Sequence, residues 1–225
     1  ITSYALLDAQ GRDVADTAIT EIGTDKSDRD YFKIPFETGR PYVSPVRFSP
    51  TIRAASLYFS NPIFDKGNIV GILRVRYSAT ILQQLIAKTI NSGGPESFAA
   101  LFDEHHIHLA HATNPLVMFK PVVPLDPALS AELKAARRLP AQSTAASALN
   151  LPDLDQGLTQ AATQPNFAAA DVGSGDRVYQ AAVATLETQP WLVAFFQPQE
   201  VFLSPIQTQV QAAVLFAGVI AGLVV

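Results

Sequence analysis

Arg29, Tyr31 and Phe32 are residues whose types and spacing suit the binding of a small anion. A guanidinium presents two parallel donors that match the two oxygens of a carboxylate, and aromatic walls keep water away from such a contact. The three side chains therefore predict a site for a small carboxylate. The alternative is structural, with Arg29 pairing with a nearby acid and only ordering a loop. The acids close to it in sequence are Asp16, Asp28 and Asp30.

The composition excludes several other chemistries. The chain of 225 residues has no cysteine, which excludes disulfides, thiol nucleophiles and iron–sulfur clusters. Its 16 basic and 20 acidic side chains give a net charge of −4, whereas a nucleic-acid partner would require a basic face. The sequence has neither a Gly-x-Ser-x-Gly elbow nor a phosphate-loop pattern. We therefore expect a segment without catalytic residues that binds no nucleic acid.

Two segments of the chain share one pattern. Residues 5–16 and 100–111 each read as an apolar strand, a turn that starts at Asp8 or Asp103, and a second strand. An Asp side chain stabilises such a turn by accepting hydrogen bonds from the backbone. Each half then ends with two strands around a short turn, at 56–60 and 69–76 in the first half and at 177–183 and 191–196 in the second. The repeat predicts two similar antiparallel sheets.

All four histidines lie in one short stretch, at positions 105, 106, 108 and 111. His106 and His108 are two residues apart and would project from one face of a strand, a spacing that suits zinc. The repeat instead places His105 and His106 in an exposed turn, with Ile107 and Leu109 pointing inward. We expect no metal and no cofactor, and a metal sensor is a minor alternative.

The regions around the strands predict helices and loops. Residues 78–91 place five apolar side chains at helical spacing after a Ser78 cap, and the segment 92–95 ends the helix. Residues 139–166, rich in Ala, Ser, Thr, Gln and Pro, predict helical turns and loops rather than a further domain.

The C-terminal end is strongly apolar. Residues 210–225 carry no charge, and about twenty apolar residues cross a bilayer, so we expect residues 206–225 to begin a transmembrane helix. Gly218 and Gly222 would allow two such helices to approach closely, as in a homodimer. The alternative is a helix buried in a protein core.

Several short motifs together resemble the double Cache family, the PAS-like extracytoplasmic sensor domains of bacterial transmembrane receptors. They lie at residues 28–32, 38–44, 61–65 and 71–73. The resemblance implies an α/β (α+β) fold of two tandem Cache modules, each an antiparallel sheet with flanking helices, followed by a transmembrane helix. The implied bounds are 1–92 for the membrane-distal module, 93–205 for the proximal module and 206–225 for the helix.

The resemblance also implies further site residues. In this fold Tyr42, Ser44 and Tyr58 lie on strands that flank the loop with Arg29, Tyr31 and Phe32. Amino-acid-binding members carry an acid where this chain has Arg76. A cation there would repel the ammonium group of an α-amino acid, which favours a carboxylate or a dicarboxylate as the ligand.

The expected function is that of a receptor domain at the cell membrane, with residues 1–205 outside the cytoplasm. It would bind a small anion in the distal module and transmit the signal through the C-terminal helix to a kinase, a chemoreceptor or a cyclase output. The alternative is a module of the same kind of receptor that binds no ligand and serves for dimerisation or for contact with a partner protein.

Overall fold

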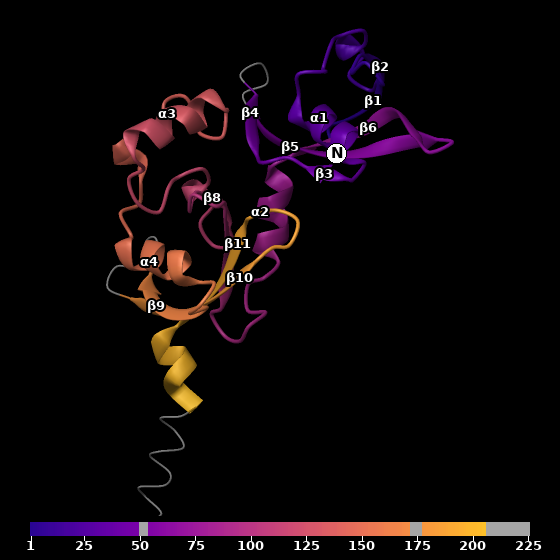
Figure 1. Ribbon diagram of the computed structural model, residues 1–225. Coiled ribbons are helices and arrows are strands. Elements are labelled where there is room, and N and C mark those ends of the chain that lie inside the picture. The colour runs from indigo at the N-terminus through magenta and orange to yellow at the C-terminus, as the bar shows by residue number, and fades with distance from the viewer. Residues whose placement is uncertain (50–53, 172–176, 206–225) are drawn as a thin grey trace, which may run out of the picture.

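A computed structural model describes residues 1–49, 54–171 and 177–205, and within them the chain forms two separate antiparallel sheets (Figure 1). The first has the strand order β2-β1-β6-β5-β3, with β4 also pairing with β5, and the second has the order β8-β7-β11-β10-β9. Elements of the first half are β1 (Ser3–Asp8), β2 (Asp13–Asp16), η1 (Ile19–Glu21), α1 (Asp30–Thr38), β3 (Tyr42–Val43), β4 (Arg47–Ser49), β5 (Ala54–Asp65), β6 (Asn68–Ser78) and α2 (Thr80–Ala87). Those of the second half are β7 (Phe98–Phe102), β8 (His108–His111), η2 (Pro115–Val117), α3 (Pro127–Ala135), η3 (Ala145–Ser147), α4 (Pro152–Gln160), β9 (Asn166–Ala170), β10 (Val178–Thr185) and β11 (Leu192–Pro198).

The two predicted Asp turns are present and are built alike. One carboxylate oxygen of Asp8 accepts the backbone N–H groups of Gln10 and Arg12, each at 2.9 Å. The corresponding oxygen of Asp103 accepts those of His105 at 3.0 Å and Ile107 at 2.9 Å. Each strand pair also shifts its register at the same place, between residues 6 and 7 and between residues 101 and 102. The repeat seen in the sequence is thus a repeat of hydrogen bonds.

Two helices differ from the sequence prediction. Residues 30–38, expected as part of a loop, form α1, which ends where Gly39 adopts a left-handed conformation with φ of 65°. The helix predicted at 78–91 is α2, which spans only Thr80–Ala87 and is preceded by Ala79 without a side-chain cap. The residues after it form turns because Asn91 and Gly94 both have positive φ.

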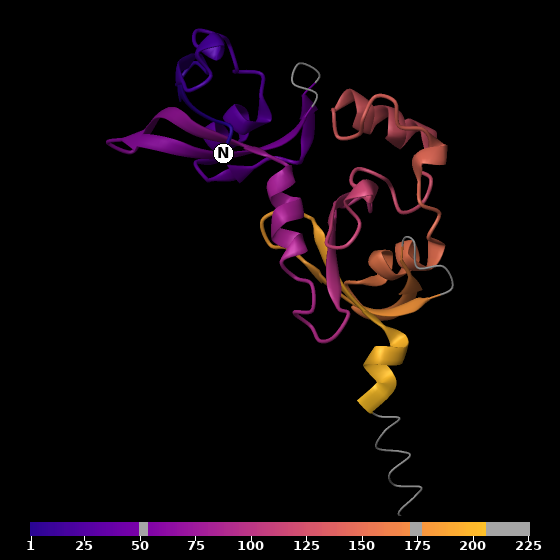
Figure 2. The ribbon, with the colours of Figure 1, turned by 180° about the vertical axis from the view of Figure 1, so that it is seen from behind.

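Helix α2 joins the two sheets (Figures 1 and 2). Its Leu82 and Ile86 are buried in the main core, which continues from Leu57 of β5 to Phe102 and Phe196 of the second sheet. A smaller core under the first sheet contains Ala5, Leu7, Tyr31, Phe32 and Ile72. Because one core extends from β5 through α2 to the second sheet, a shift of α2 would change the packing of both sheets.

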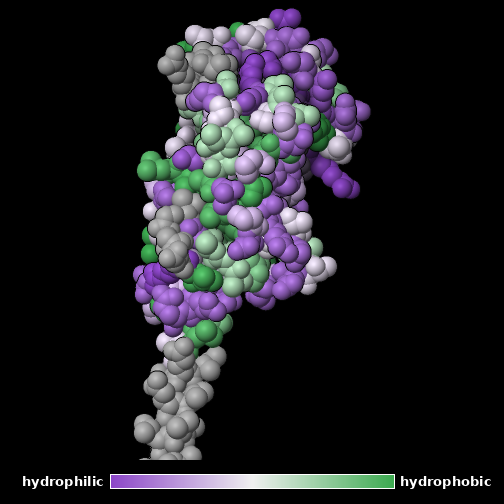
Figure 3. All heavy atoms as spheres, turned by 90° about the vertical axis from the view of Figure 1, so that its left-hand side faces the viewer, coloured by the Kyte–Doolittle hydropathy of each residue, from purple (hydrophilic) through white to green (hydrophobic). Residues whose placement is uncertain are grey.

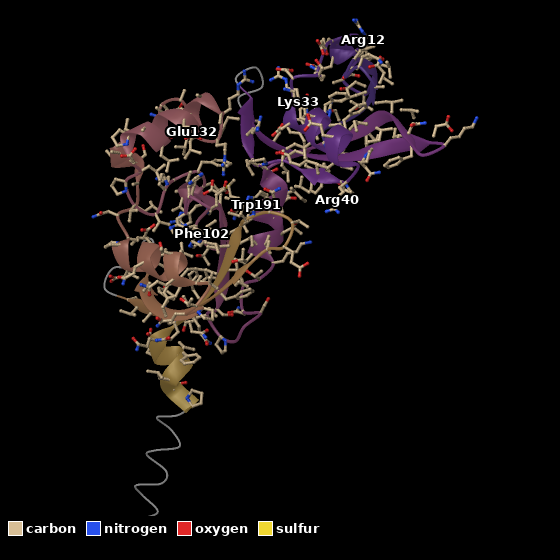
Figure 4. The ribbon with its side chains drawn as sticks, in the orientation of Figure 1. Arg12, Lys33, Arg40, Phe102, Glu132 and Trp191 are labelled. Carbon is tan, nitrogen blue, oxygen red and sulfur yellow. The ribbon has the colours of Figure 1, made fainter. Side chains whose placement is uncertain are left out.

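The surface is largely hydrophilic on the face shown in Figure 3. Phe102 and Trp191 lie inside the second half, whereas Arg12, Lys33 and Arg40 project outward from the first (Figure 4). Residues 199–205 form a helix directly after β11. None of the helices in the described ranges is long and apolar enough to span a membrane. The predicted span at 206–225 lies outside those ranges.

Replacing the Asp of each turn should lower the free energy of unfolding by different amounts. Asp8→Ala removes a partly exposed acceptor and should reduce the free energy of unfolding by about 1 kcal/mol. Asp103→Ala removes a buried acceptor that also binds Arg138 at 3.0 Å, so about 2 to 4 kcal/mol should be lost. Urea unfolding measures both. Asp103→Asn, which keeps the accepting oxygen, serves as the control, and equal losses at the two turns would contradict this account.

Candidate functional site

A cavity of about 400 Å³ lies between the first sheet and the end of α3. Its described lining residues from the first half are Glu21, Lys26, Arg29, Tyr31, Arg47, Phe48, Tyr58, Arg74 and Arg76, and those from the second half are Ala135, Ala136 and Arg137. Six of these side chains are cationic and one, Glu21, is acidic. Of the seven site residues predicted from the sequence, the cavity brings together four: Arg29, Tyr31, Tyr58 and Arg76.

Strand alternation sets the floor of the cavity. Tyr58 of β5 pairs with Arg76 of β6, and Ser60 pairs with Arg74, so these four side chains lie on one face of the sheet. Arg74 and Arg76 are two residues apart on β6, and both line the cavity. Their surroundings differ, because Arg74 is buried and Arg76 is only half-buried.

Arg74 is held by a buried set of polar groups. Its guanidinium donates to Asp16 at 2.6 Å and to Ser3 at 2.5 Å, and one of its nitrogens lies 3.9 Å from Asp13. Burying a charge in this way is tolerable only where an opposite charge and hydrogen bonds meet it. The contacts fix the guanidinium at the cavity wall without the freedom of a surface arginine.

Two tyrosines cover this guanidinium. The rings of Tyr31 and Tyr58 stack with centroids 4.7 Å apart, and the Arg74 guanidinium lies 5.9 Å from the centroid of each. Burial raises the pKa of Tyr31 above its usual value, so its hydroxyl stays neutral. The site therefore offers the neutral Tyr31 hydroxyl beside a fixed cation.

The remaining first-half cations mostly have acidic partners. Lys26 contacts Glu21 at 2.5 Å, and Arg29 contacts Asp28 at 3.2 Å. Arg47 contacts Asp30 at 2.5 Å. The structural alternative for Arg29 is thus present as well, but that pair is largely exposed and worth little. Among the described residues, Arg76 has no acidic partner and donates to the Thr2 hydroxyl at 3.1 Å.

Three predicted site residues have other positions. Phe32 is buried in the small core and stacks on Phe36 one helical turn later, because consecutive residues of α1 point in different directions. The Tyr42 hydroxyl donates to Asp30 at 2.8 Å. The Ser44 hydroxyl accepts the Tyr58 N–H at 2.9 Å and donates to the Pro45 carbonyl at 2.8 Å. All three support the walls and none is among the described lining residues.

Sequence reasoning missed the rest of the lining. Strand alternation by itself reads Arg74 as a solvent-facing residue, and no local pattern places Lys26, Arg47 or Arg137 at a site. A signal for α3 was present in Asp126-Pro127, because Asp126 caps the helix by accepting the N–H groups of residues 128 and 129 and Pro127 starts it. No local sequence pattern predicts that the end of α3 lies beside the first sheet.

The histidines lie in the second sheet and its turn. His106 is in the Asp103 turn with φ of 55°, not on a strand, and contacts Asp155 at 2.6 Å. His108 and His111 are fully buried, and His111 contacts Asp171 at 3.1 Å. Within the described residues, no group of three or more metal-ligating side chains is placed to hold an ion.

Comparison with known proteins rests on structure. No protein-family model matches this sequence, and no curated protein does either. The sensor domain of the V. cholerae histidine kinase DctB superposes with a TM-score of 0.65 at 17% identity, over 88% of this chain and 72% of that one. The periplasmic domain of Chlamydia trachomatis RsbU gives 0.61 at 12% identity, over 91% and 72%. The ligand-binding domain of the Pseudomonas aeruginosa chemoreceptor PctC, in complex with GABA, gives 0.51 at 14%, over 87% and 74%.

The fold is that of a Cache-type sensor domain. The predicted combination of antiparallel sheets with flanking helices is confirmed at this level. In this Cache fold, the first sheet holds the cavity described above, and the turn at Asp8 and strand β2 place Asp13 and Asp16 beneath its floor.

Asp13 of β2 is a fully buried acid. Both of its carboxylate oxygens are buried, and neither has a hydrogen-bond partner among the described residues. Burial, and then the charge of the neighbouring Asp16, raise its pKa to about 6, although the cations Arg74 and Lys26 oppose the shift. A raised pKa means that the folded state holds the proton more tightly than the unfolded chain does.

Asp13 therefore predicts a pH-dependent stability. The stabilisation that comes from protonated Asp13 is complete below pH 4, which is about the pKa of Asp in the unfolded chain. It is lost as the pH rises through about 6, the pKa in the folded state. Asp13→Asn, which has no proton to lose, should stabilise the protein at pH 7.5 by roughly 1 to 3 kcal/mol, and the gain should vanish toward pH 4. Asp16→Asn is the matched control and should destabilise at pH 7.5, because it breaks the pair with Arg74. Thermal unfolding across this pH range measures both, and a gain independent of pH would exclude Asp13 as the cause.

Proposed function

We propose that this chain is the extracytoplasmic sensor region of a bacterial transmembrane receptor and binds a small anion in the cavity on its first sheet. The observation that carries the proposal is the charge of that cavity, in which six cationic side chains and one carboxylate surround about 400 Å³. The Cache fold supports it, since the similar solved domains include sensor and ligand-binding domains of histidine kinases and chemoreceptors. In this role the segment binds and signals without catalysing a reaction.

The ligand we favour is a carboxylate or a dicarboxylate. Arg29 and Arg76 can each present a fork of donors to two oxygens, and Tyr31 and Tyr58 provide a wall beside them. The ammonium group of an α-amino acid would need a carboxylate that is not already paired. Glu21 is the acid in the described lining, and Lys26 occupies it at 2.5 Å. Ammonium therefore has no favourable place, whereas anionic groups have several.

Each sheet belongs to a module with its own role in this proposal. We assign residues 1–92 to a membrane-distal module that binds the ligand, 93–205 to a proximal module, and 206–225 to the start of a membrane helix. Gln83 of α2 supports a path between the modules, because its side-chain amide donates to the His111 carbonyl at 2.8 Å and accepts the His111 N–H at 3.1 Å. The helix at 199–205 then continues directly from β11, so a displacement of the second sheet would reach it.

The alternative function is dimerisation or contact with a partner protein, and one observation favours it. The face of the first sheet opposite the cavity exposes large apolar side chains, namely Tyr4, Leu6, Phe59 and Leu73. An apolar patch of this kind on a sheet often marks a contact surface. A homodimer that uses it is compatible with anion binding on the other face.

A thermal-shift screen tests the proposal on the 225-residue chain. Acetate, succinate, citrate and inorganic phosphate are compared with succinamide, the neutral analogue of succinate. We expect at least one anion to raise the melting temperature, and succinamide to have no effect. Arg29→Ala should abolish the shift with the fold intact, and Arg76→Ala should reduce the shift that carboxylates cause, because each charged hydrogen bond contributes roughly 1.5 to 3 kcal/mol.

Lys33→Ala is the control for this screen. It removes a cation from the exposed side of α1, outside the cavity lining, and should leave the shift unchanged. Binding that survives Arg29→Ala, measured by calorimetry with the same anion, would move the site elsewhere. A response to none of the anions would leave dimerisation or partner contact as the better account.

A further inference from the structure

One wall of the cavity comes from the second half of the chain. Ala135, Ala136 and Arg137, at the C-terminal end of α3, line it opposite the cations of the first sheet. Two contacts of Phe48 join β4 to the second half beside the cavity, and the first of them is made to the end of α3. The Phe48 N–H of β4 donates to the Arg137 carbonyl at 2.7 Å, and the Phe48 ring packs edge-on against Phe119 with centroids 4.4 Å apart.

Arg137 occupies a backbone position that favours glycine. Its φ is 60°, and the N–H of Arg138 closes the helix end by donating to the Leu133 carbonyl at 2.7 Å. Glycine adopts this left-handed conformation without strain, whereas a side chain with a Cβ atom is strained there. A strained residue beside a cavity is grounds for asking what its side chain does.

The two adjacent arginines have different surroundings. Arg138 contacts Asp103 at 3.0 Å and Glu104 at 2.7 Å and so ties α3 to the turn of the second sheet. Arg137 is exposed at the cavity and has no acidic partner among the described residues. Its charge is thus available to a ligand, while that of Arg138 is used within the fold.

We infer that Arg137 is a ligand-binding residue supplied by the second half, so that the bound anion is held between both halves of the chain. The inference rests on the proposed function and adds the residue through which occupancy of the cavity acts on the second sheet. An anion that contacts Arg76 and Arg137 together draws the end of α3 toward the first sheet. Because α3 is tied to the Asp103 turn, that pull acts on β7 and β8.

Calorimetry with succinate and with inorganic phosphate tests the inference on the 225-residue chain. Arg137→Gly removes the guanidinium and suits the positive φ, so the variant should melt no lower than the native protein. Its affinity for the anion should fall by about tenfold or more. Lys134→Gln removes an equal charge three residues earlier on α3, outside the cavity lining, and should change the affinity less than about twofold. Arg137→Lys should keep part of the affinity.

The outcomes separate the inference from the proposed function. If Arg137→Gly binds like the native chain while Arg29→Ala does not, the site belongs to the first half alone and the inference is overturned. If neither anion binds the native chain, both fail. Should Arg137→Gly fold poorly, Arg137→Asn replaces it, because Asn also tolerates this conformation. Amide hydrogen exchange gives an independent measurement. Succinate should slow exchange in residues 127–139 of the native chain, and unchanged exchange there would contradict a shared site.

Discussion

A buried guanidinium must be neutralised where it lies, and the first sheet is organised around that requirement at Arg74. Ser3 of β1 and Asp16 of β2 accept hydrogen bonds from it, and two tyrosines, from α1 and β5, cover it. Removing Asp16 would leave the Arg74 charge without its ion-pair partner in a place that water does not easily reach. The strand register, the position of the first turn and the packing of α1 are therefore tied to a single side chain, which also faces the cavity.

Arg74 is paired with Asp16, but the other cations that line the cavity are only partly neutralised. Salt bridges occupy Lys26, Arg29 and Arg47, yet each pair lies partly in solvent and leaves positive potential toward the hollow. The acids, apart from Glu21, lie behind or beside the lining and not in it. Such an arrangement favours anions near the cavity, while the fold itself does not depend on a bound anion.

Turns and strand pairs can be predicted from the sequence, whereas contacts between distant parts of the chain cannot. The Asp8 and Asp103 turns and the strand pairs around them follow from short patterns, and so does the association of an arginine with aromatic residues. Alternation alone could not tell that Arg74 is buried, since a strand with two polar residues on one face reads as solvent-exposed. The spacing of Arg29, Tyr31 and Phe32 predicts that Phe32 belongs to the site, whereas helix α1 directs its ring into the small core. The wall formed by α3 depends on tertiary packing between residues about ninety positions apart, which no local pattern encodes.

The two sheets place different residues at equivalent buried positions, and this determines which substitutions each sheet accepts. Through the shared register, Asp13 and Asp16 correspond to His108 and His111. Arg74, which pairs with Ala5, corresponds to Ala194, which pairs with Ala100. Burial lowers the pKa of His108 to about 4, so its imidazole is neutral and needs no arginine across the sheet. A buried carboxylate does need one. Replacing Asp16 or Arg74 alone should therefore be poorly tolerated, because each needs the other's charge, whereas His108 needs no charged partner across its sheet.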